Sequence, residues 1–386
     1  MRITDDIIYE GVNDHEIDLF EGQYDVPLGM SYNSYVILDE MVAVMDSVDA
    51  SAGDEWMANL EAALAGRTPD YLVVQHMEPD HSANIVRFMD TYPTAQVVAS
   101  AKAFTFMKNF YGTDYADRQV VVKEGDTLEL GAHALSFIGA PMVHWPEVIM
   151  TYDAARKTLF TADAFGKFGA LDIEDPDGWA CEARRYYFGI VGKFGKQVQA
   201  VLKKAAALDI ARICPLHGPV LDEDLAYYLD LYNTWSSYGV ESEGIAVAYC
   251  SVYGHTKDAV ELLASKLEEA GCPKVAVSDL ARDDMAEAVE DAFRYGTLVL
   301  ASPTIANDMF PAMKTFIDHL ADHAFQNRRV AFVENGSWGP AAAKAMRAKM
   351  EACKDITFAE NTVTVLSALS DDSRAQIDAL VAELMG

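Results

Sequence analysis

The stretch QHMEPDHSAN, residues 75–84, carries two histidines and two carboxylates within six consecutive positions: His76, Glu78, Asp80 and His81. It directly follows YLVV, residues 71–74, an apolar run of the kind that forms a buried strand. Four such polar side chains on one loop have little structural use, because burying them without partners would be costly. The stretch therefore predicts a metal site at the end of a strand.

Three more candidate ligands appear further along the chain, each just past an apolar stretch. His144 lies in GAPMVHWPE, Asp163 in LFTADAFG and His217 in ICPLHGP. A single tetrahedral zinc needs four ligands. Seven candidates, one of them a carboxylate able to bridge, indicate two adjacent metals held where several strand ends converge.

The composition limits the function classes. Half of the 386 residues are hydrophobic, enough for two or three domain cores, and the formal net charge is −30. Nucleic acid is a poor partner for such a chain, since phosphate binding needs clustered Lys and Arg. No signal pattern and no membrane-spanning run of 18 apolar residues is present. Five scattered cysteines without a CxxC pair predict a reducing compartment, the cytoplasm, and argue against a cysteine-ligated metal cluster.

The chain reads as two domains, 1–243 and 244–386, separated by the polar stretch SSYGVESEG. The first alternates many short strand-like runs with helices at 53–66, 82–92 and 187–208, which suggests two packed sheets with helical cover. The second repeats a buried strand followed by a helix five times. That rhythm predicts an open, doubly wound parallel sheet.

Three loops of the second domain leave the carboxyl ends of predicted strands, where such sheets bind ligands. The first loop, YCSVYGHTKD, opens a helix whose N-terminus suits a phosphate. Neither GxGxxG nor a P-loop lysine is present, which disfavours a dinucleotide and ATP. The candidate residues are Ser251, Tyr253, Gly254, His255 and Thr256 in the first loop, Ser302, Pro303, Thr304 and Asn307 in the second, and Asn335, Gly336, Ser337, Trp338 and Gly339 in the third.

The HxExDH stretch resembles the HxHxDH motif of the metallo-β-lactamase superfamily, with Glu78 in place of the second histidine, and the later His, Asp and His follow that superfamily's order. Carboxylate is a harder ligand than imidazole, so the exchange favours iron or manganese over zinc. The first loop of the second domain resembles the FMN loop of flavodoxins. Joined in this order, the two signals resemble the flavodiiron proteins over essentially the whole chain. The implied fold is a metallo-β-lactamase-like αββα sandwich (α+β) followed by a flavodoxin-like α/β domain.

The resemblance implies a non-haem diiron oxidoreductase with FMN that reduces dioxygen to water or nitric oxide to nitrous oxide. One iron would take His76, Glu78 and His144, the other Asp80, His81 and His217, and Asp163 would bridge them. An external donor, rubredoxin or a reduced deazaflavin, would reduce the FMN. The resemblance also implies a head-to-tail homodimer, or a dimer of such dimers, in which the flavin of one subunit meets the irons of the other. Trp145 and Trp338 are candidates for that junction, because each lies beside its own site in the sequence.

Two other functions compete with this interpretation: a zinc-dependent hydrolase with an appended flavodoxin domain, and a pure electron carrier whose first domain is structural. Glu78 and the three carboxylates in the ligand set count against the zinc hydrolase. The sequence leaves open the choice between dioxygen and nitric oxide, the electron donor, and dimer or tetramer.

Overall fold

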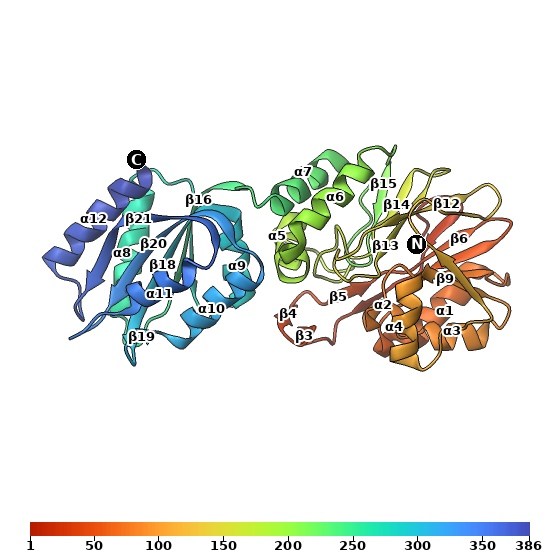
Figure 1. The fold of residues 1–386 in the computed structure, drawn as a ribbon, viewed down its shortest axis with the longest axis horizontal. Coiled ribbons are helices and arrows are strands. Elements are labelled where there is room, and N and C mark those ends of the chain that lie inside the picture. Colours follow the sequence, from red (N-terminus) through yellow and green to blue (C-terminus); the bar gives the residue numbers. More distant parts are fainter. The chain divides into compact units, whose positions relative to one another are not determined.

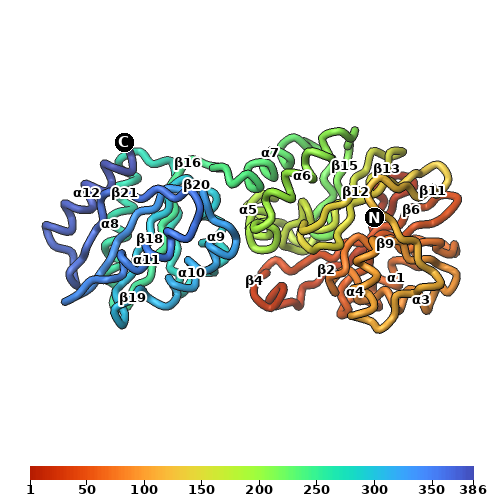
Figure 2. The backbone as a smooth tube through the Cα atoms, in the orientation of Figure 1, coloured from red at the N-terminus to blue at the C-terminus, as the bar shows by residue number.

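The computed structural model describes residues 1–386, and the chain divides into two compact units, Met1–Asn233 and Thr234–Gly386. The division falls within helix α7 (Leu225–Ser236), which begins in the first unit and ends in the second. The boundary expected after residue 243 lies inside β16 (Ser242–Tyr249), the first strand of the second unit. Figures 1 and 2 show the chain coloured along its length.

The first unit contains two mixed sheets packed face to face. One has the strand order β1-β6-β7-β8-β9-β10 and the other β11-β12-β13-β14-β15, and two short hairpin-like pairs, β2-β5 and β3-β4, lie beside them. The strands are β1 (Ile7–Tyr9), β2 (Val12–Asp14), β3 (Leu19–Phe20), β4 (Tyr24–Asp25), β5 (Met30–Tyr32), β6 (Tyr35–Leu38), β7 (Val42–Met45), β8 (Tyr71–Val73), β9 (Gln96–Ser100), β10 (Gln119–Val122), β11 (Thr127–Glu129), β12 (Ala134–Gly139), β13 (Ile149–Asp153), β14 (Thr158–Phe160) and β15 (Arg212–Cys214).

The core of this unit lies between its two sheets. Ile37, Met45 and Val73 from the first sheet meet Phe137 and Phe160 from the second, all essentially without solvent exposure. Burial of this apolar surface is the main force that holds two such sheets together. The two-sheet sandwich predicted for the first domain is confirmed.

Helices cover the outer faces of both sheets (Figure 1). The helical elements of this unit are η1 (Ala50–Ala52), α1 (Gly53–Leu64), α2 (Pro79–Ser82), α3 (Ile85–Thr91), α4 (Ala101–Tyr111), α5 (Trp179–Tyr186), η2 (Tyr187–Val191), η3 (Gly192–Phe194), α6 (Gly195–Ala205) and the start of α7. In Figure 1, α1, α3 and α4 lie beside the first sheet, and α6 lies beside the second. The helix predicted over 53–66 ends at Leu64, because Ala65 and Gly66 are left-handed (φ 48° and 86°).

The single helix predicted over 187–208 is confirmed only in part, because the stretch is not one regular helix. A π-helical turn (η2) and a 3-10 turn (η3) precede the regular helix α6. Gly189, Gly192 and Gly195 fall in or next to this region, and glycine weakens a regular helix. A Cβ at Gly189 would meet the Tyr24 ring at 2.9 Å, and the Tyr24 hydroxyl donates to the Gly189 carbonyl at 2.8 Å. Close packing against the β3-β4 segment therefore requires glycine here.

The second unit is a five-stranded parallel sheet with helices on both faces, as predicted. Its strand order, β17-β16-β18-β20-β21, is the flavodoxin-like 2-1-3-4-5 arrangement, and a short strand β19 pairs antiparallel with β18. The remaining elements are β17 (Val275–Asp279), β18 (Tyr295–Ile305), β19 (Asp308–Met309), β20 (Gln326–Asn335), β21 (Lys354–Val365), α8 (His255–Glu269), α9 (Met285–Arg294), α10 (Pro311–Asp322), α11 (Ala342–Met350) and α12 (Asp371–Met385). None of the helices in the chain is both long and apolar enough to cross a membrane.

Candidate metal centre and loop pocket

The HxExDH stretch begins where β8 ends and contains one helical turn, α2, with Pro79 at its first position. Proline is favoured there because its missing N–H would have no partner in the helix. Asp46, fully buried at the end of β7, fixes the start of the stretch by accepting hydrogen bonds from the Gln75 backbone N–H (2.7 Å) and side-chain amide (2.9 Å). Burial raises the pKa of Asp46 to about 6 although the Gln75 hydrogen bonds oppose that shift.

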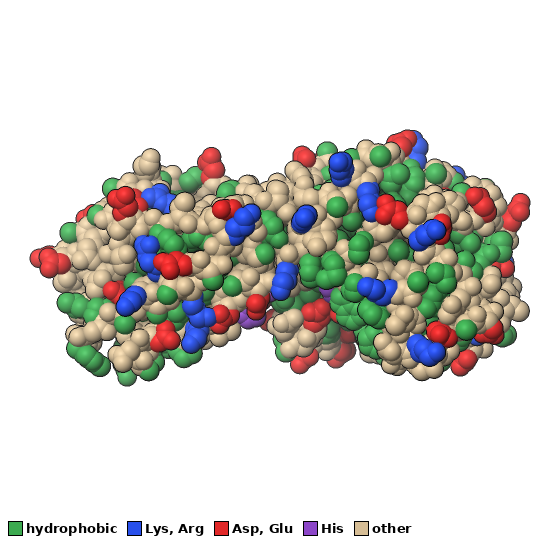
Figure 3. Space-filling model, in the orientation of Figure 1, with side chains coloured by type: hydrophobic (Ala, Val, Ile, Leu, Met, Phe, Trp, Pro, Cys, Tyr) green, Lys and Arg blue, Asp and Glu red, His purple; other side chains and the backbone are tan.

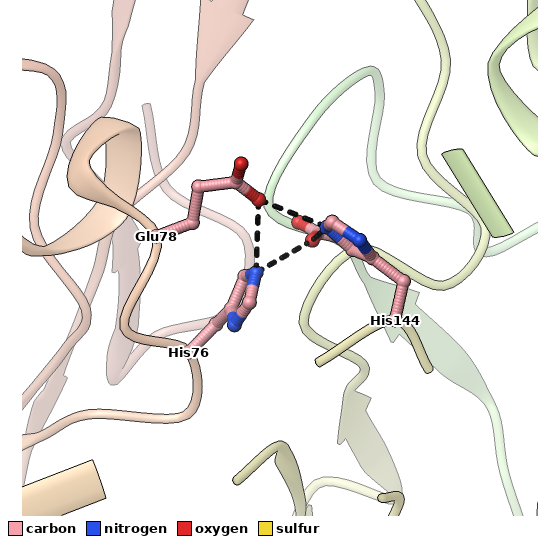
Figure 4. Close-up of side chains that lie close together, drawn as sticks. His76, Glu78 and His144 are labelled. Atoms are coloured by element: carbon pink, nitrogen blue, oxygen red, sulfur yellow. Dashed lines mark hydrogen bonds and ion pairs between the residues drawn. The ribbon is translucent and has the colours of Figure 1, made fainter. Parts of the chain in front are cut away.

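His76, Glu78 and His144 converge with Asp163 in one ligand group, and all their ligand atoms lie within 4.8 Å of one another. Figure 4 shows the Glu78 carboxylate and the two imidazole rings pointing toward one another. Glu78 Oε2 lies 3.2 Å from His76 Nε2 and 2.9 Å from His144 Nε2. Asp163 Oδ2 lies 3.2 Å and 3.1 Å from the same two nitrogens.

Asp80, His81 and His217 form a second group. Asp80 Oδ2 lies 3.2 Å from the Nε2 atoms of both His81 and His217, and these two nitrogens are only 3.0 Å apart. The other oxygen of Asp163, Oδ1, lies 3.2 Å from His81 Nε2 and 3.8 Å from His217 Nε2. One carboxylate thus faces both groups, one oxygen to each, which is the arrangement of a bridging ligand.

The carboxylate oxygens of the two ligand groups are not all satisfied by hydrogen bonds, and a pair of metal ions would satisfy them. Both oxygens of Asp80 and Oδ1 of Asp163 are buried without a hydrogen-bond donor, although imidazole nitrogens lie close by. Buried polar atoms without partners are rare and costly, and metal ligation would satisfy them. Four imidazoles with three carboxylates are a ligand set suited to iron.

In two of the histidines, Nδ1, the ring nitrogen that faces away from the centre, lies within hydrogen-bond distance of an acceptor. His76 Nδ1 lies 2.8 Å from Oε1 of the buried Glu147, and His217 Nδ1 lies 2.7 Å from the Ser31 carbonyl. Because both acceptors require a proton on Nδ1, Nε2 is left to face the centre, the tautomer that a metal-binding histidine needs. Glu147 was not among the residues predicted from the sequence, although it lies only three positions after His144.

Charges within the centre shift the pKa values of its members in opposite directions. Burial lowers the pKa of His144, but its bonds to Asp163 and Glu78 raise it to about 9. Burial alone would raise the pKa of Asp163, yet the neighbouring histidines hold it well below its usual value. Metal binding at His144 would therefore compete with protonation of its ring.

A separate cavity of ≈ 360 Å³ lies in the second unit among loops at the carboxyl ends of its strands. Of the residues predicted to bind a flavin, eleven line it: Tyr253, His255, Thr256, Pro303, Thr304, Asn307, Asn335, Gly336, Ser337, Trp338 and Gly339. Trp338 and Tyr253 are 96% and 90% exposed, so their rings are free to cover a flat ligand. The buried Thr256 stands in the first turn of α8, at its positive end.

The other three predicted residues shape the loops instead of lining the cavity. Gly254 takes a left-handed conformation (φ 97°) directly before α8. Ser251 accepts the Gly254 and Lys257 N–H groups, and Ser302 accepts the Phe310 N–H. Four lining residues were missed: Val252, Ile305, Ala306 and Ser367. Ser367 follows the fifth parallel strand and forms two hydrogen bonds with Asn335. The expectation that ligands bind at the carboxyl ends of the strands, applied to this strand as well, would have found it.

An apolar hollow of ≈ 560 Å³ opens beside the metal centre. Phe106, Phe110, Trp145 and Phe194 line it together with the ligand His144. The Phe110 ring, 47% exposed, stacks on Trp145 at 6.4 Å and 12°. Figure 3 shows hydrophobic side chains gathered on the surface around α4, the helix that carries Phe106 and Phe110.

Comparison with known proteins gives a consistent result. A family model described as ODP family beta lactamase matches residues 30–218. A nitric oxide reductase of Moorella thermoacetica is 31% identical over 95% of this chain and 93% of its own length.

Two solved structures extend the similarity over both units. The flavodiiron protein of Giardia intestinalis has a TM-score of 0.92 at 24% identity, covering 99% of this chain and 95% of its own. The rubredoxin oxygen:oxidoreductase of Desulfovibrio gigas has a TM-score of 0.90 at 22% identity, covering 100% and 97%.

Proposed function

This chain belongs to the flavodiiron proteins, a family of oxidoreductases that use FMN and a non-haem diiron centre, and we propose that it reduces dioxygen to water, nitric oxide to nitrous oxide, or both. The observation that carries the proposal is the position of Asp163, whose two carboxylate oxygens face two different ligand groups 3.2 Å away. Such a carboxylate is suited to hold two metal ions side by side.

One iron would be held by His76, Glu78 and His144, the other by Asp80, His81 and His217, and Asp163 would lie between them. Glu147 and the Ser31 carbonyl keep two of the histidines oriented through their outer nitrogens. When bound, the iron pair and FMN would supply the redox chemistry. The protein residues would hold the metals, and the apolar side chains around Trp145 line the hollow beside them.

FMN would occupy the cavity of the second unit. Its phosphate would meet the N-terminus of α8 near Thr256, and its ring would lie between the loops that carry Asn307 and Trp338. We assign the flavin domain to residues 244–386 and the diiron domain to residues 1–243.

The assembly that we propose is a head-to-tail homodimer or a dimer of such dimers. Electron transfer needs both cofactors close together, and both sites have exposed aromatic residues next to them. The exposed Trp338 and Tyr253 stand at the flavin cavity, and the exposed Phe110 stacks on the partly buried Trp145 beside a metal ligand. Large exposed aromatic side chains are typical of interaction sites. The electron donor would be rubredoxin or a reduced deazaflavin, and the compartment would be the cytoplasm.

The decisive experiment is anaerobic reduction of the iron- and FMN-loaded protein, followed by stopped-flow mixing with dioxygen or with nitric oxide. We expect reoxidation of the flavin in the wild type by at least one gas, and none above the rate of free flavin in Asp163→Asn. Metal analysis of anaerobically prepared protein tests the zinc hydrolase at the same time. Two zinc ions without iron, or equal reoxidation rates in wild type and variant, would refute the diiron assignment.

A further inference from the structure

The loop that carries Asp163 has an unusual backbone. Ala162 and Phe165, on either side of the ligand, are both left-handed, with φ of 51° and 67°. Side chains with a Cβ rarely adopt this conformation, which persists only where the surroundings hold it in place. Because each oxygen of Asp163 faces a different ligand group, a small rotation of this loop would misplace both oxygens at once.

Bonds near the ligand hold the first half of the loop. The Thr161 hydroxyl donates to the Ala164 carbonyl at 2.7 Å, and the Leu216 N–H donates to the Ala162 carbonyl at 2.9 Å. The Gly166 N–H donates to the Asp163 carbonyl at 3.0 Å, and a Cβ on Gly166 would lie 2.9 Å from that oxygen. None of these bonds holds the N–H of the left-handed Phe165.

Tyr232, on helix α7, supplies that missing partner. Its hydroxyl oxygen accepts the Phe165 N–H, and its ring stacks on the Phe165 ring with centroids 4.0 Å apart and planes 22° apart. Tyr232 is fully buried, and Tyr187 packs edge-on against its ring at 5.2 Å. One side chain therefore fixes both the backbone and the ring of the residue two positions after the bridging carboxylate.

We propose that Tyr232 is a positioning residue for the bridging carboxylate. It acts by keeping Phe165 left-handed, so that Asp163 Oδ1 and Oδ2 each point to their own ligand group. The inference rests on the proposed function to the extent that the centre holds two metal ions bridged by Asp163.

The test is Tyr232→Phe, which keeps the stacked ring and removes only the hydroxyl. We expect loss of metal to a chelator to become up to about 10-fold faster, the lower end of the effect of removing a group that bonds a metal ligand directly, because Tyr232 acts through Phe165. We also expect an altered EPR signal of the mixed-valent iron pair, since a bridging carboxylate takes part in the magnetic coupling of the two ions. The matched control is Tyr152→Phe, which removes a tyrosine hydroxyl that donates to the Asp209 carbonyl at 2.8 Å, away from the metal centre.

Thermal unfolding and FMN content of both variants establish that they fold. The proposal would be overturned if Tyr232→Phe released metal at the wild-type rate and kept the wild-type EPR signal. It would also be overturned if metal release became equally faster in the Tyr152→Phe control. If the wild-type protein held two zinc ions, the proposed function would be refuted but the role of Tyr232 would not. The rates of zinc release from the wild type and from Tyr232→Phe would still test that role. A wild-type protein that binds no metal pair would overturn both.

Discussion

Replacement of Glu147 by glutamine is expected to weaken metal binding without disturbing the fold. Glu147 Oε1 accepts from His76 Nδ1 at 2.8 Å and from the Met77 N–H at 3.0 Å, and its side chain is fully buried. Glutamine keeps an oxygen for both donors and removes the negative charge that makes the imidazole a stronger ligand. Glu147→Ala would instead leave both donors unpaired.

The expected size of the effect follows from these contacts. Loss of an outer carboxylate partner costs roughly 10- to 100-fold in metal affinity, and tenfold corresponds to about 1.4 kcal/mol. We expect Glu147→Gln at the lower end of that range. Glu147→Ala should also lower the free energy of unfolding by about 1–3 kcal/mol for each buried donor left without an acceptor.

The assay is a competition titration of ferrous or cobaltous ion between the protein and a chelator, combined with thermal unfolding of the metal-free protein. Glu10→Gln is the matched control, since Glu10 is also buried and accepts only from the Ser34 hydroxyl at 3.2 Å. Metal affinity in Glu147→Gln equal to that of the wild type would refute the reasoning, as would an equal loss in Glu10→Gln.

Three further results are expected. Metal uptake at pH 7 should release protons and tighten as the pH rises to about 9, because the raised pKa of His144 keeps it protonated in the metal-free protein; pH-independent affinity would contradict this. The hydrogen bond to Asp153 is the main cause of the raised pKa of His133, so protonated His133 stabilises the fold at low pH and this contribution is lost as the pH rises. His133→Asn should therefore lower the unfolding temperature more at pH 6 than at pH 9. A mixed dimer of Asp163→Asn and Thr256→Glu subunits should keep about half of the activity if electrons cross between subunits, and an inactive mixed dimer would exclude that route.

Much of the architecture was predictable because it repeats simple local patterns. The second unit alternates buried strands and helices, and each of the five predicted strands overlaps one of its five parallel strands. In the first unit, candidate ligands could be found because each follows an apolar run. The structure brings all seven into two adjacent groups.

What the sequence did not reveal depends on contacts between distant residues. Tyr232 lies 67 positions from Phe165, and a tyrosine on an apolar helix has the same pattern as any core residue. Tyr24 donates to the Gly189 carbonyl of the π-helical turn at 187–191 across 165 positions, a contact that no local pattern encodes. Asp46 holds the metal-binding loop from another strand, 29 positions before Gln75.

The order of the ligands along the chain has a consequence for biosynthesis. All seven candidate ligands lie between residues 76 and 217, whereas the flavin cavity draws on residues as late as Ser367. Domains generally fold as units during translation, beginning with the N-terminal one. The ribosome therefore exposes a complete set of metal ligands while much of the flavin domain is still unmade, and α7 with Tyr232 follows them directly. The ligand set of the metal centre is thus complete before the flavin cavity can form.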